Sequence, residues 1–400
     1  MNILYHHRTQ GHGAEGVHIT GIVKGFRKMG HEVILHSPPG VDPFKTAGSY
    51  LYGQQKSLIG NLWKGISRHS PQVLFELIEI AYNFFQSAAL NRILKDQKIS
   101  LIYERYAFFL WQTARLSKKY GIPLILEVNE IAGIKRARPL ILRNLAQMIE
   151  KRVFNQAARI VTVSSFLKRK IMEMGISEEK IIVMPNGVDL EMFKVQTAAA
   201  NVRKQYGLED SLVLGFVGWI DPWDNLPGFL EVFHDLLKRQ ANLKLLLIGD
   251  VAGKGVNRSL VGEMVERLGL SGTVTHIPKV PRTEMPNYIA AMDICVIPDS
   301  NAFGSPVVLF EFMAMGKAVV APSVAPVLDV ITHGENGLVF QADNGPSMSG
   351  AIWDAVRDPA LRHKLSSEAR KSVEQKHNWE SNSKEILRIY SELGPRMATR

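Results

Sequence analysis

Short apolar runs alternate with longer amphipathic stretches along this chain. Runs of β-branched and apolar residues predict strands buried on both faces, and helical spacing between them predicts covering helices. In the first half the predicted strands are Asn2–His6, Val33–His36, Leu101–Tyr106, Leu124–Asn129, Arg159–Ser164 and Ile181–Pro185. The predicted helices there are Val17–Met29, a long helical region within 51–97, and a basic amphipathic segment at Ala132–Phe154. We expect Tyr82, Phe84 and Phe85 of the long region to lie in the core.

The same alternation restarts after Val195–Gly207, a polar and alanine-rich stretch that we expect to be a linker. The strands predicted beyond it are Ser211–Gly218, Leu243–Gly249, Val274–Ile277, Asp293–Pro298 and Ala318–Ala321. Helices are predicted from Leu226, at Pro286–Met292, at Ser347–Val373 and at Asn378–Leu393. Strands alternating with helices in two separate series predict an α/β protein with two Rossmann-like domains.

The most informative stretch is Asp293–Ala321, which predicts a strand, a loop, a helix and a second strand. Ser305 followed by Pro306 is typical of a helix start, and Gly316 is typical of its end, so the helix should span Val307–Met315. Backbone N–H groups at such a helix start form an anion site. Glu311 falls among apolar residues of this helix, where its carboxylate needs a partner. Ligand hydroxyl groups are one candidate.

Four phrases of the chain form a set: RTQGHGAEG at residues 8–16, PNGVD at 185–189, LFEFMAMGKAVVAP at 309–322 and HGENGLVF at 333–340. This set resembles the phrases of the family 4 glycosyltransferases, which are retaining enzymes of the two-domain GT-B fold. The resemblance covers nearly the whole chain. It implies an acceptor domain over residues 1–195, joined by a returning C-terminal helix at 380–400, and a donor domain over 208–378.

Candidate site residues come from the resemblance and from position in the predicted sheet. The resemblance implies a catalytic position for Glu311, and the loop and helix after the first strand give Glu15 and His18 as acceptor candidates. Arg105, Glu127 and Asn129 lie at the carboxyl ends of predicted parallel strands, where ligands of such sheets bind. We take Arg105 and Glu127 as catalytic candidates and Asn129 as an acceptor candidate. The donor positions that the resemblance implies are Gly13, Gly304, Ser305, Pro306, Val307, Val308, Leu309 and Glu311. Lys254 and Lys279 are added as donor candidates because the chain lacks the family's basic pair. Glu311 would bind the nucleotide ribose. The chain departs from the family pattern at Phe303, where members have a glutamate, and at Trp219 and Asp224, where they have an arginine and a lysine. Members often carry a histidine near the position of Arg105.

Transfer from a nucleotide sugar requires stabilisation of the departing diphosphate. The chain has no Asp-x-Asp pair to hold a metal, so we expect no metal and no cofactor, with the nucleotide diphosphate sugar as co-substrate. The backbone amides of residues 304–309 then need added positive charge, because a helix start supplies only about half a unit. Lys254, Lys279 or Arg282 could provide it, and across the whole chain we rank Lys254 before Arg8 and Arg105.

Composition bounds the remaining possibilities. The 400 residues are 46% apolar and include one cysteine, Cys295, in a predicted strand. No disulfide can form, no signal pattern opens the chain and no long uncharged apolar run occurs, so we expect a cytoplasmic protein without a spanning helix. Residues 1–200 hold 27 Lys and Arg against 15 Asp and Glu, whereas residues 201–400 hold 21 against 23. The first half should therefore face something anionic: a phospholipid surface, a lipid diphosphate acceptor or a nucleic acid.

Because of the resemblance, we do not expect the anionic partner to be a nucleic acid. We expect instead that the protein attaches peripherally to the inner face of a membrane. Two interpretations of function stay open. In one, the protein is a metal-independent hexosyltransferase of cell-surface polysaccharide assembly that acts on a glycan, glycolipid or lipid-linked acceptor. In the other, the site has decayed and the protein binds a sugar nucleotide or a partner without turnover. A small soluble acceptor also fits the sequence.

Overall fold

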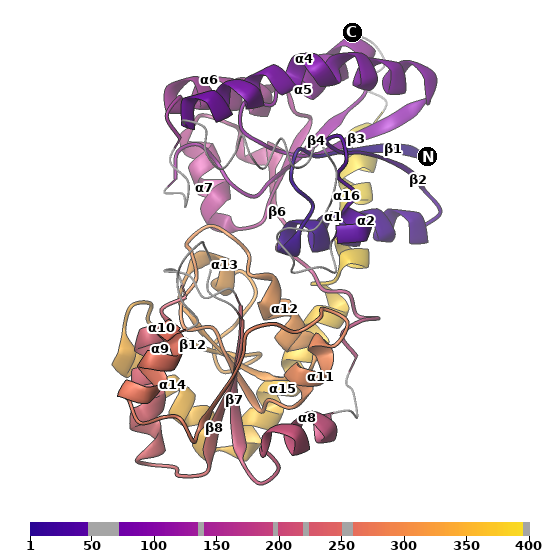
Figure 1. The fold of residues 1–400 in the computed structure, drawn as a ribbon. Helices are drawn as coiled ribbons and strands as arrows, with labels where there is room; N and C mark the ends of the chain where they lie inside the picture. The colour runs from indigo at the N-terminus through magenta and orange to yellow at the C-terminus, as the bar shows by residue number, and fades with distance from the viewer. Residues whose placement is uncertain (47–71, 135–139, 195–198, 219–223, 250–258, 395–400) are drawn as a thin grey trace. The chain divides into compact units, whose positions relative to one another are not determined.

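The computed structural model describes residues 1–46, 72–134, 140–194, 199–218, 224–249 and 259–394 (Figure 1). The chain forms two compact units. Unit 1 comprises Met1–Pro185 and Trp379–Arg400, and unit 2 comprises Asn186–Asn378. Within the described residues each unit contains one six-stranded sheet, and its neighbouring strands run parallel. The predicted α/β architecture is therefore confirmed.

In unit 1 the strands follow the order β2-β1-β3-β4-β5-β6. They are β1 Asn2–His6, β2 Glu32–His36, β3 Ile99–Arg105, β4 Leu124–Val128, β5 Arg159–Thr162 and β6 Ile181–Val183. The helices are α1 Gly13–Lys28, α2 Pro43–Thr46, α4 Gln72–Asp96, α5 Gln112–Tyr120, α6 Arg143–Gln156, α7 Ser165–Glu173, the 3-10 turn η1 Glu178–Lys180 and the C-terminal α16 Trp379–Glu392. The α4, α5 and α6 helices cover one face of the sheet, and α1 and α16 cover the other (Figure 1).

The C-terminal helix α16 packs closely on α1. A Cβ atom added at Gly21 would lie 2.5 Å from the Trp379 ring, and one at Gly25 would lie 2.2 Å from the Ser383 hydroxyl oxygen. Only glycine leaves room for this approach. The last helix therefore belongs to the core of unit 1, although it is separated in sequence from the rest of that unit.

The long helix α4 contradicts one sequence prediction. Tyr82 is buried as expected, but Phe84 and Phe85 are 71% and 79% exposed. Among the described residues, α4 alone is long and apolar enough to cross a membrane by length and composition. A single helix of that kind often belongs to a soluble protein, so the observation does not by itself identify a span.

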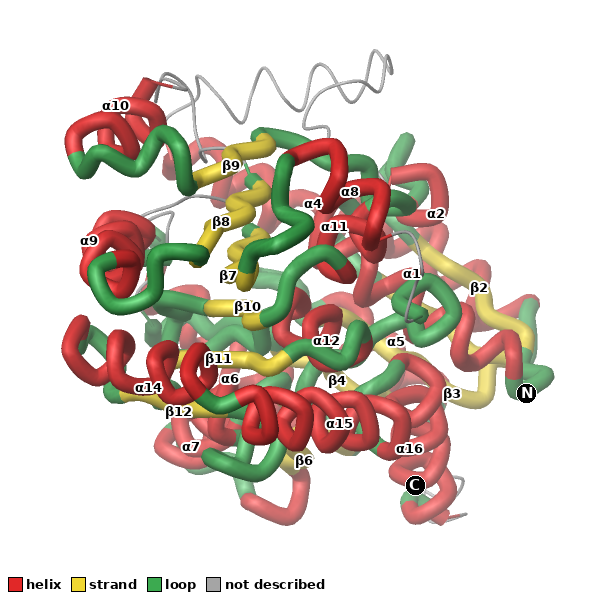
Figure 2. Tube along the Cα trace, turned by 90° about the horizontal axis from the view of Figure 1, so that it is seen from below, coloured by secondary structure: helices red, strands yellow, loops and turns green. Residues whose placement is uncertain are grey.

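In unit 2 the strands follow the order β12-β11-β10-β7-β8-β9, which Figure 2 shows side by side. They are β7 Leu212–Val217, β8 Leu243–Ile248, β9 Val274–Ile277, β10 Ile294–Val296, β11 Ala318–Pro322 and β12 Leu338–Phe340. The helices are α8 Ala199–Tyr206, α9 Leu226–Leu237, α10 Ser259–Arg267, α11 Met285–Ala290, α12 Val307–Ala314, α13 Ala325–Leu328, α14 Gly345–Arg357 and α15 Pro359–Gln375. The core lies between the sheet and α9 and α14.

Some boundaries differ from the sequence predictions. The expected linker at Val195–Gly207 contains helix α8, with residues 195–198 outside the described residues. Unit 2 begins earlier, at Asn186, whose backbone and side-chain amides both bond to Ser305 within that unit. Helix α6 begins at Arg143 rather than Ala132, because residues 132–134 form a turn and the Glu76 carboxylate accepts the N–H groups of Ile141 and Leu142 just before the helix.

Candidate functional site

Both sheets reverse their strand order once, and the polar clusters of each unit lie at that point. In unit 1 the reversal falls between β1 and β3, and in unit 2 between β7 and β10. Ligands of open parallel sheets bind at the carboxyl ends of the strands beside such a reversal, because neighbouring loops separate there and leave a crevice. We therefore describe the carboxyl ends of these four strands, one unit at a time.

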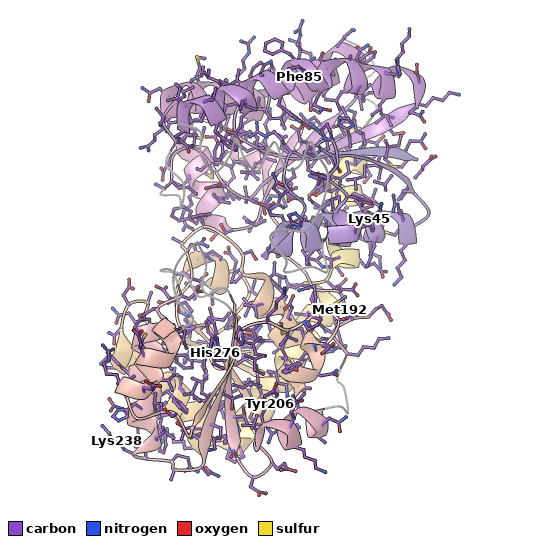
Figure 3. All side chains as sticks on the ribbon, in the orientation of Figure 1. Lys45, Phe85, Met192, Tyr206, Lys238 and His276 are labelled. Atoms are coloured by element: carbon purple, nitrogen blue, oxygen red, sulfur yellow. The ribbon has the colours of Figure 1, made fainter. Side chains whose placement is uncertain are left out.

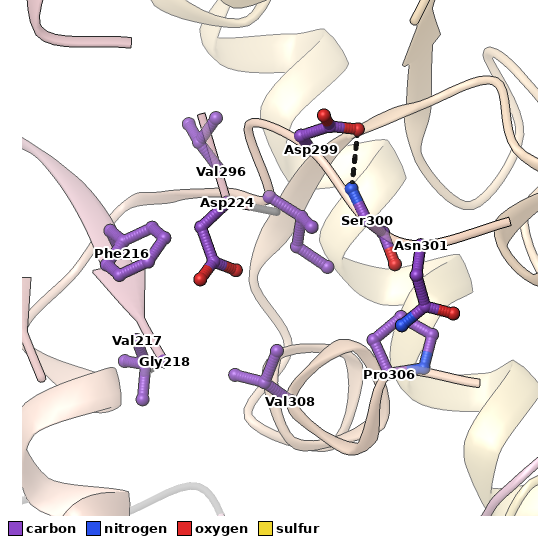
Figure 4. Close-up of a pocket in the computed structure, with 11 residues that line it drawn as sticks. Phe216, Val217, Gly218, Asp224, Val296, Asp299, Ser300, Asn301, Pro306 and Val308 are labelled. Carbon is purple, nitrogen blue, oxygen red and sulfur yellow. Dashed lines mark hydrogen bonds between the residues drawn. The ribbon is translucent and has the colours of Figure 1, made fainter. Parts of the chain in front are cut away.

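Unit 2 has a pocket of about 170 Å³ at the carboxyl ends of β7 and β10 (Figure 4). Its apolar wall comes from the two strands and from Pro306 and Val308 at the start of α12. Its polar wall comes from the following loops: Asp224, Asp299, Ser300 and Asn301. The sequence predicted Pro306 and Val308 as donor residues, and the structure places both at this pocket.

The start of α12 differs from the prediction in its capping. The Ser305 side chain is no N-cap, because its hydroxyl accepts the backbone N–H of Asn186 at 3.1 Å. The N-cap position is Pro306, which makes no side-chain cap bond, and the helix ends at Ala314 before Gly316 with its φ of +61°.

The backbone amides predicted to hold phosphate are only partly available. The Asn301 side-chain oxygen accepts the N–H of Gly304 at 2.5 Å, and the N–H of Leu309 bonds to the Pro306 carbonyl at 3.2 Å. The N–H groups of Val307 and Val308 belong to the first turn, where a helix provides no internal acceptor. These two remain suited to an anion.

The Glu311 carboxylate has a protein partner. Arg282 donates from Nη2 to Glu311 Oε1 at 2.6 Å, and both side chains are buried. The Arg282 guanidinium also lies 5.3 Å from the centre of the Phe193 ring. Arg282 is therefore already paired with a carboxylate, and the prediction that it could supply positive charge to a diphosphate stays untested. The ribose role of Glu311 stays a prediction, since Glu311 is not among the residues that line the pocket.

The described lining of the pocket carries negative rather than positive charge. Asp224 and Asp299 line it, and no Lys or Arg is among the described lining residues. Burial raises the pKa of Asp299, with Asp343 adding to the effect and the Ser300 N–H opposing it. Of the predicted cations, Lys279 is exposed in the loop after β9 and does not line the pocket. Trp219 and Lys254 lie outside the described residues.

In unit 1, three predicted residues and Tyr5 meet around one buried carboxylate, that of Glu127 at the end of β4. Its Oε2 lies 2.7 Å from His18 Nε2 of α1 and 3.3 Å from the Tyr5 hydroxyl. Its Oε1 accepts from the Asn129 side chain at 2.7 Å and from the Arg105 guanidinium of β3. The Glu127 carboxylate thus contacts four side chains, and its catalytic role stays a prediction.

Charge compensation stabilises this cluster. Burial alone would raise the pKa of Glu127, but His18 and Arg105 outweigh it and hold that pKa well below its usual range. Burial alone would lower the pKa of Arg105, but Glu127 and Glu15 raise it. Glu15 itself is exposed in the first turn of α1. That helix begins at Gly13, whose φ is +54°, so part of the predicted loop is helical.

Arg8, the second-ranked cation, also has a carboxylate partner. Its guanidinium donates to Glu79 of α4 at 2.7 Å and to the Glu79 carbonyl at 3.1 Å. Like Arg105, it is already neutralised within unit 1. The proposal that either residue compensates a diphosphate stays untested.

The sequence analysis missed a second buried pair in unit 1. His6 Nδ1 lies 2.5 Å from Glu104 Oε2 and 3.0 Å from the Thr113 hydroxyl. Among the described residues, His6 Nε2, Glu104 Oε1 and the Tyr82 hydroxyl are buried without a hydrogen-bond partner. Buried polar atoms of this kind usually contact water or a ligand. His6 of β1 and Glu104 of β3 lie opposite each other in register near the ends of two buried strands. Polar residues at the ends of two predicted apolar strands were the sequence pattern that could have identified this pair.

Comparison with known proteins identifies the family. A family model described as "Glycosyl transferases group 1" matches residues 199–372, and one described as "Glycosyltransferase Family 4" matches residues 15–192. The D-inositol 3-phosphate glycosyltransferase of Thermobispora bispora is 27% identical over 291 residues, which are 69% of this chain and 66% of that protein. An uncharacterized glycosyltransferase of Methanocaldococcus jannaschii is 26% identical over 241 residues, 59% of this chain and 60% of its own length. The alignments thus span less than two thirds of both relatives.

Solved structures agree on the fold. A glycosyltransferase from Rickettsia africae has a TM-score of 0.75 at 17% identity, and each chain covers 98% of the other. HepE of Anabaena in complex with UDP has a TM-score of 0.74 at 18% identity, covering 98% of this chain and 100% of HepE. The chain therefore has the GT-B fold and belongs to the group 1 glycosyltransferases, with a first half of the family 4 type.

Proposed function

We propose that this protein transfers a sugar from a nucleotide diphosphate sugar to a glycan, glycolipid or lipid-linked acceptor of cell-surface polysaccharide assembly. The observation that carries the proposal is the unit 2 pocket, which lies beside the strand reversal and against the first turn of α12. That turn points N–H groups outward and has the positive end of the helix dipole, which together favour a phosphate.

The nucleotide base is proposed from relatives of the same fold. HepE of Anabaena binds UDP and UDP-glucose in its structures. We therefore propose a uridine diphosphate sugar as the first donor to test. The pocket would take part of that donor, with its apolar wall of Phe216, Val217, Val296 and Ile297 against the uncharged portion.

The reaction we propose retains the sugar's configuration and needs no metal. In this chemistry an oxygen of the donor phosphate takes the proton of the acceptor hydroxyl, so little demand falls on a protein base. The Glu127 environment fits this scheme, because a carboxylate with a lowered pKa and four partners is poorly suited to accept a proton. Its contribution is to orient Arg105 and His18.

The acceptor is proposed to be anionic and to be met at a membrane. The excess of Lys and Arg in residues 1–200 favours a phosphorylated or lipid-diphosphate acceptor and attachment to anionic lipid on the cytoplasmic side. A soluble phosphorylated polyol is the second candidate, because several relatives are named D-inositol 3-phosphate glycosyltransferases.

The test is transfer from labelled UDP-sugars, with ADP- and GDP-sugars alongside, to lipid-linked sugar diphosphates, glucans and inositol phosphate. Val308→Phe should fill the pocket and abolish donor binding. Leu328→Phe is the control, because Leu328 is an exposed apolar residue of unit 2 that does not line the pocket. Binding without turnover would support the decayed-site interpretation, and no binding of any sugar nucleotide would overturn the proposal.

A further inference from the structure

Helix α4 has large apolar residues on its exposed side as well as on its buried side, where Tyr82, Leu90 and Leu94 lie. We define the α4 face as its five large apolar residues that point into solvent: Val73, Leu74, Leu77, Phe84 and Phe85, which are 38%, 46%, 49%, 71% and 79% exposed. The buried side of the same helix includes the polar residues Glu76, Asn83 and Gln86. A surface helix normally turns its apolar side inward, because burial of apolar area stabilises the fold. This helix turns much of it outward (Figure 3, Phe85).

The polar side of α4 is held by specific hydrogen bonds, so the helix cannot simply rotate. The Asn83 side chain donates to the Phe109 carbonyl at 2.7 Å and accepts the N–H groups of Trp111 and Gln112 at 2.9 and 3.1 Å. The Glu76 carboxylate accepts the N–H groups of Ile141 and Leu142, both at 2.7 Å. Rotation of α4 would leave these groups buried and unpaired, which is unfavourable because each would lose its hydrogen bonds without regaining water. The same bonds exclude a spanning position, since they hold the helix flat against unit 1.

Neighbouring residues extend the α4 face and give it a charge. Ile141 and Met148, before and within α6, are 53% and 64% exposed. Seven of the nine large exposed apolar residues found among the described residues belong to this set. Around them, the exposed charged residues of α4, α5, α6 and their adjoining turns are nine basic and one acidic. The basic ones are Arg92, Lys95, Lys98, Arg115, Lys118, Lys119, Arg143, Lys151 and Arg152, and the acidic one is Asp96.

We propose that the α4 face, with Ile141 and Met148, inserts into the headgroup region of an anionic lipid bilayer. Apolar residues surrounded by basic ones match that layer, which is apolar below and negatively charged at its surface. This inference rests on the membrane attachment proposed above and identifies the residues that perform it.

The first test compares sedimentation with vesicles of phosphatidylcholine alone and of phosphatidylcholine mixed with phosphatidylglycerol. The double variant Phe84→Ser/Phe85→Ser should bind the anionic vesicles roughly tenfold or more weakly than the wild type. Phe44→Ser is the matched control, because Phe44 is also an exposed phenylalanine of unit 1, at 39%, but lies on α2. Circular dichroism and urea unfolding check that the variants are folded.

The second test reads insertion directly. Cys295 is the single cysteine and is buried, so a cysteine introduced by Phe85→Cys can be labelled selectively with an environment-sensitive fluorophore. Its emission should shift to the blue on anionic vesicles. Label at Leu328→Cys, an exposed position of unit 2 at 53%, should not shift.

The outcomes separate the two proposals. If the wild type ignores anionic vesicles, membrane attachment itself fails. If the wild type binds and the double variant binds equally well, attachment stands but the α4 face is not its surface. A lipid-free dimer that the double variant dissociates, measured by light scattering, would show instead that a second copy covers this face.

Discussion

Arg282 and Glu311 form a buried ion pair in unit 2, with Nη2 and Oε1 2.6 Å apart. Glu311 is the residue that the sequence assigned to the ribose of a donor. The pair gives the Glu311 carboxylate a structural role, which is to compensate the buried charge of Arg282. This structural role can be separated by experiment from the predicted role of Glu311 in binding the ribose.

Glu311→Gln should lower the free energy of unfolding by about 2–4 kcal/mol, because Arg282 would keep a buried charge without a counter-charge. Arg282→Met should cost a similar amount, and the pair Arg282→Met/Glu311→Leu should recover much of it. Urea unfolding measures this. If Glu311 also binds the ribose, calorimetry will show weaker donor binding in Glu311→Gln than in Arg282→Met. Equal donor affinity in both would remove the ribose role.

Glu127→Gln should destabilise unit 1 by about 3–5 kcal/mol, since it leaves buried Arg105 unpaired. Asn129→Ala is the comparison, because it removes one hydrogen bond to the same carboxylate and should cost about 1 kcal/mol. Denaturant unfolding distinguishes them. Equal effects of the two changes would contradict the view that the Arg105–Glu127 pair organises the cluster.

Asp299→Asn should tighten binding of a nucleotide diphosphate, because it removes a negative charge from the pocket lining. We expect a gain of roughly tenfold at low salt and less at high salt, since salt screens such interactions. Calorimetry with UDP at two ionic strengths measures it, and Ser300→Ala is the uncharged control in the same loop. Weaker binding in Asp299→Asn would mean that the carboxylate contacts the donor favourably.

Transfer should continue in the presence of a chelator. The chain has no Asp-x-Asp pair, and the described residues contain no group of three or more His, Cys, Asp or Glu arranged to hold a metal. The assay is initial rate with chelator, then with added magnesium or manganese. Loss of activity that either metal restores would show that a cation assists the diphosphate.

Stability should fall as the pH drops from about 6.5 towards 4. Burial, with neighbouring charges, lowers the pKa of His7 to about 3, so the folded protein leaves it neutral while the unfolded chain binds a proton near pH 6.5. Because the unfolded state then holds more protons, stability is fully present above pH 6.5 and falls below it, by up to about 1.4 kcal/mol per pH unit for this buried group. Half-buried His36, whose pKa burial lowers to about 4, adds to the trend. Urea unfolding at pH 7 and 5 measures the slope, which His7→Gln should flatten.

The strand and helix pattern was readable from the sequence because it depends on local periodicity. The buried strands are short apolar runs, and every one predicted lies within one or two residues of the observed strand ends. The family phrases added the GT-B fold, and polar residues at the ends of predicted strands brought Arg105, Glu127 and Asn129 to attention, with His18 on the helix after the first strand. These four meet because they occupy neighbouring strand ends and the facing helix, and strand order follows from that fold.

Other features depended on contacts between residues far apart in the chain. Phe84 and Phe85 have the same composition signal as core residues, yet Asn83 and Glu76 direct them outward through bonds to residues 26 to 66 positions away. Ser305 has the signature of a helix cap, yet its hydroxyl is taken by Asn186, 119 residues earlier.

Sequence by itself therefore determined the elements, the fold and the residues with chemical potential, because these follow from local propensity and motif. Tertiary structure alone decided which partner each charged group has: Arg282 pairs with Glu311, and Glu79 pairs with Arg8. It also decided that the apolar residues Phe84 and Phe85 of α4 are exposed. The reason is that a buried charge or an amphipathic face is satisfied by whatever the folded chain brings within a few ångströms, and no local pattern specifies that neighbour.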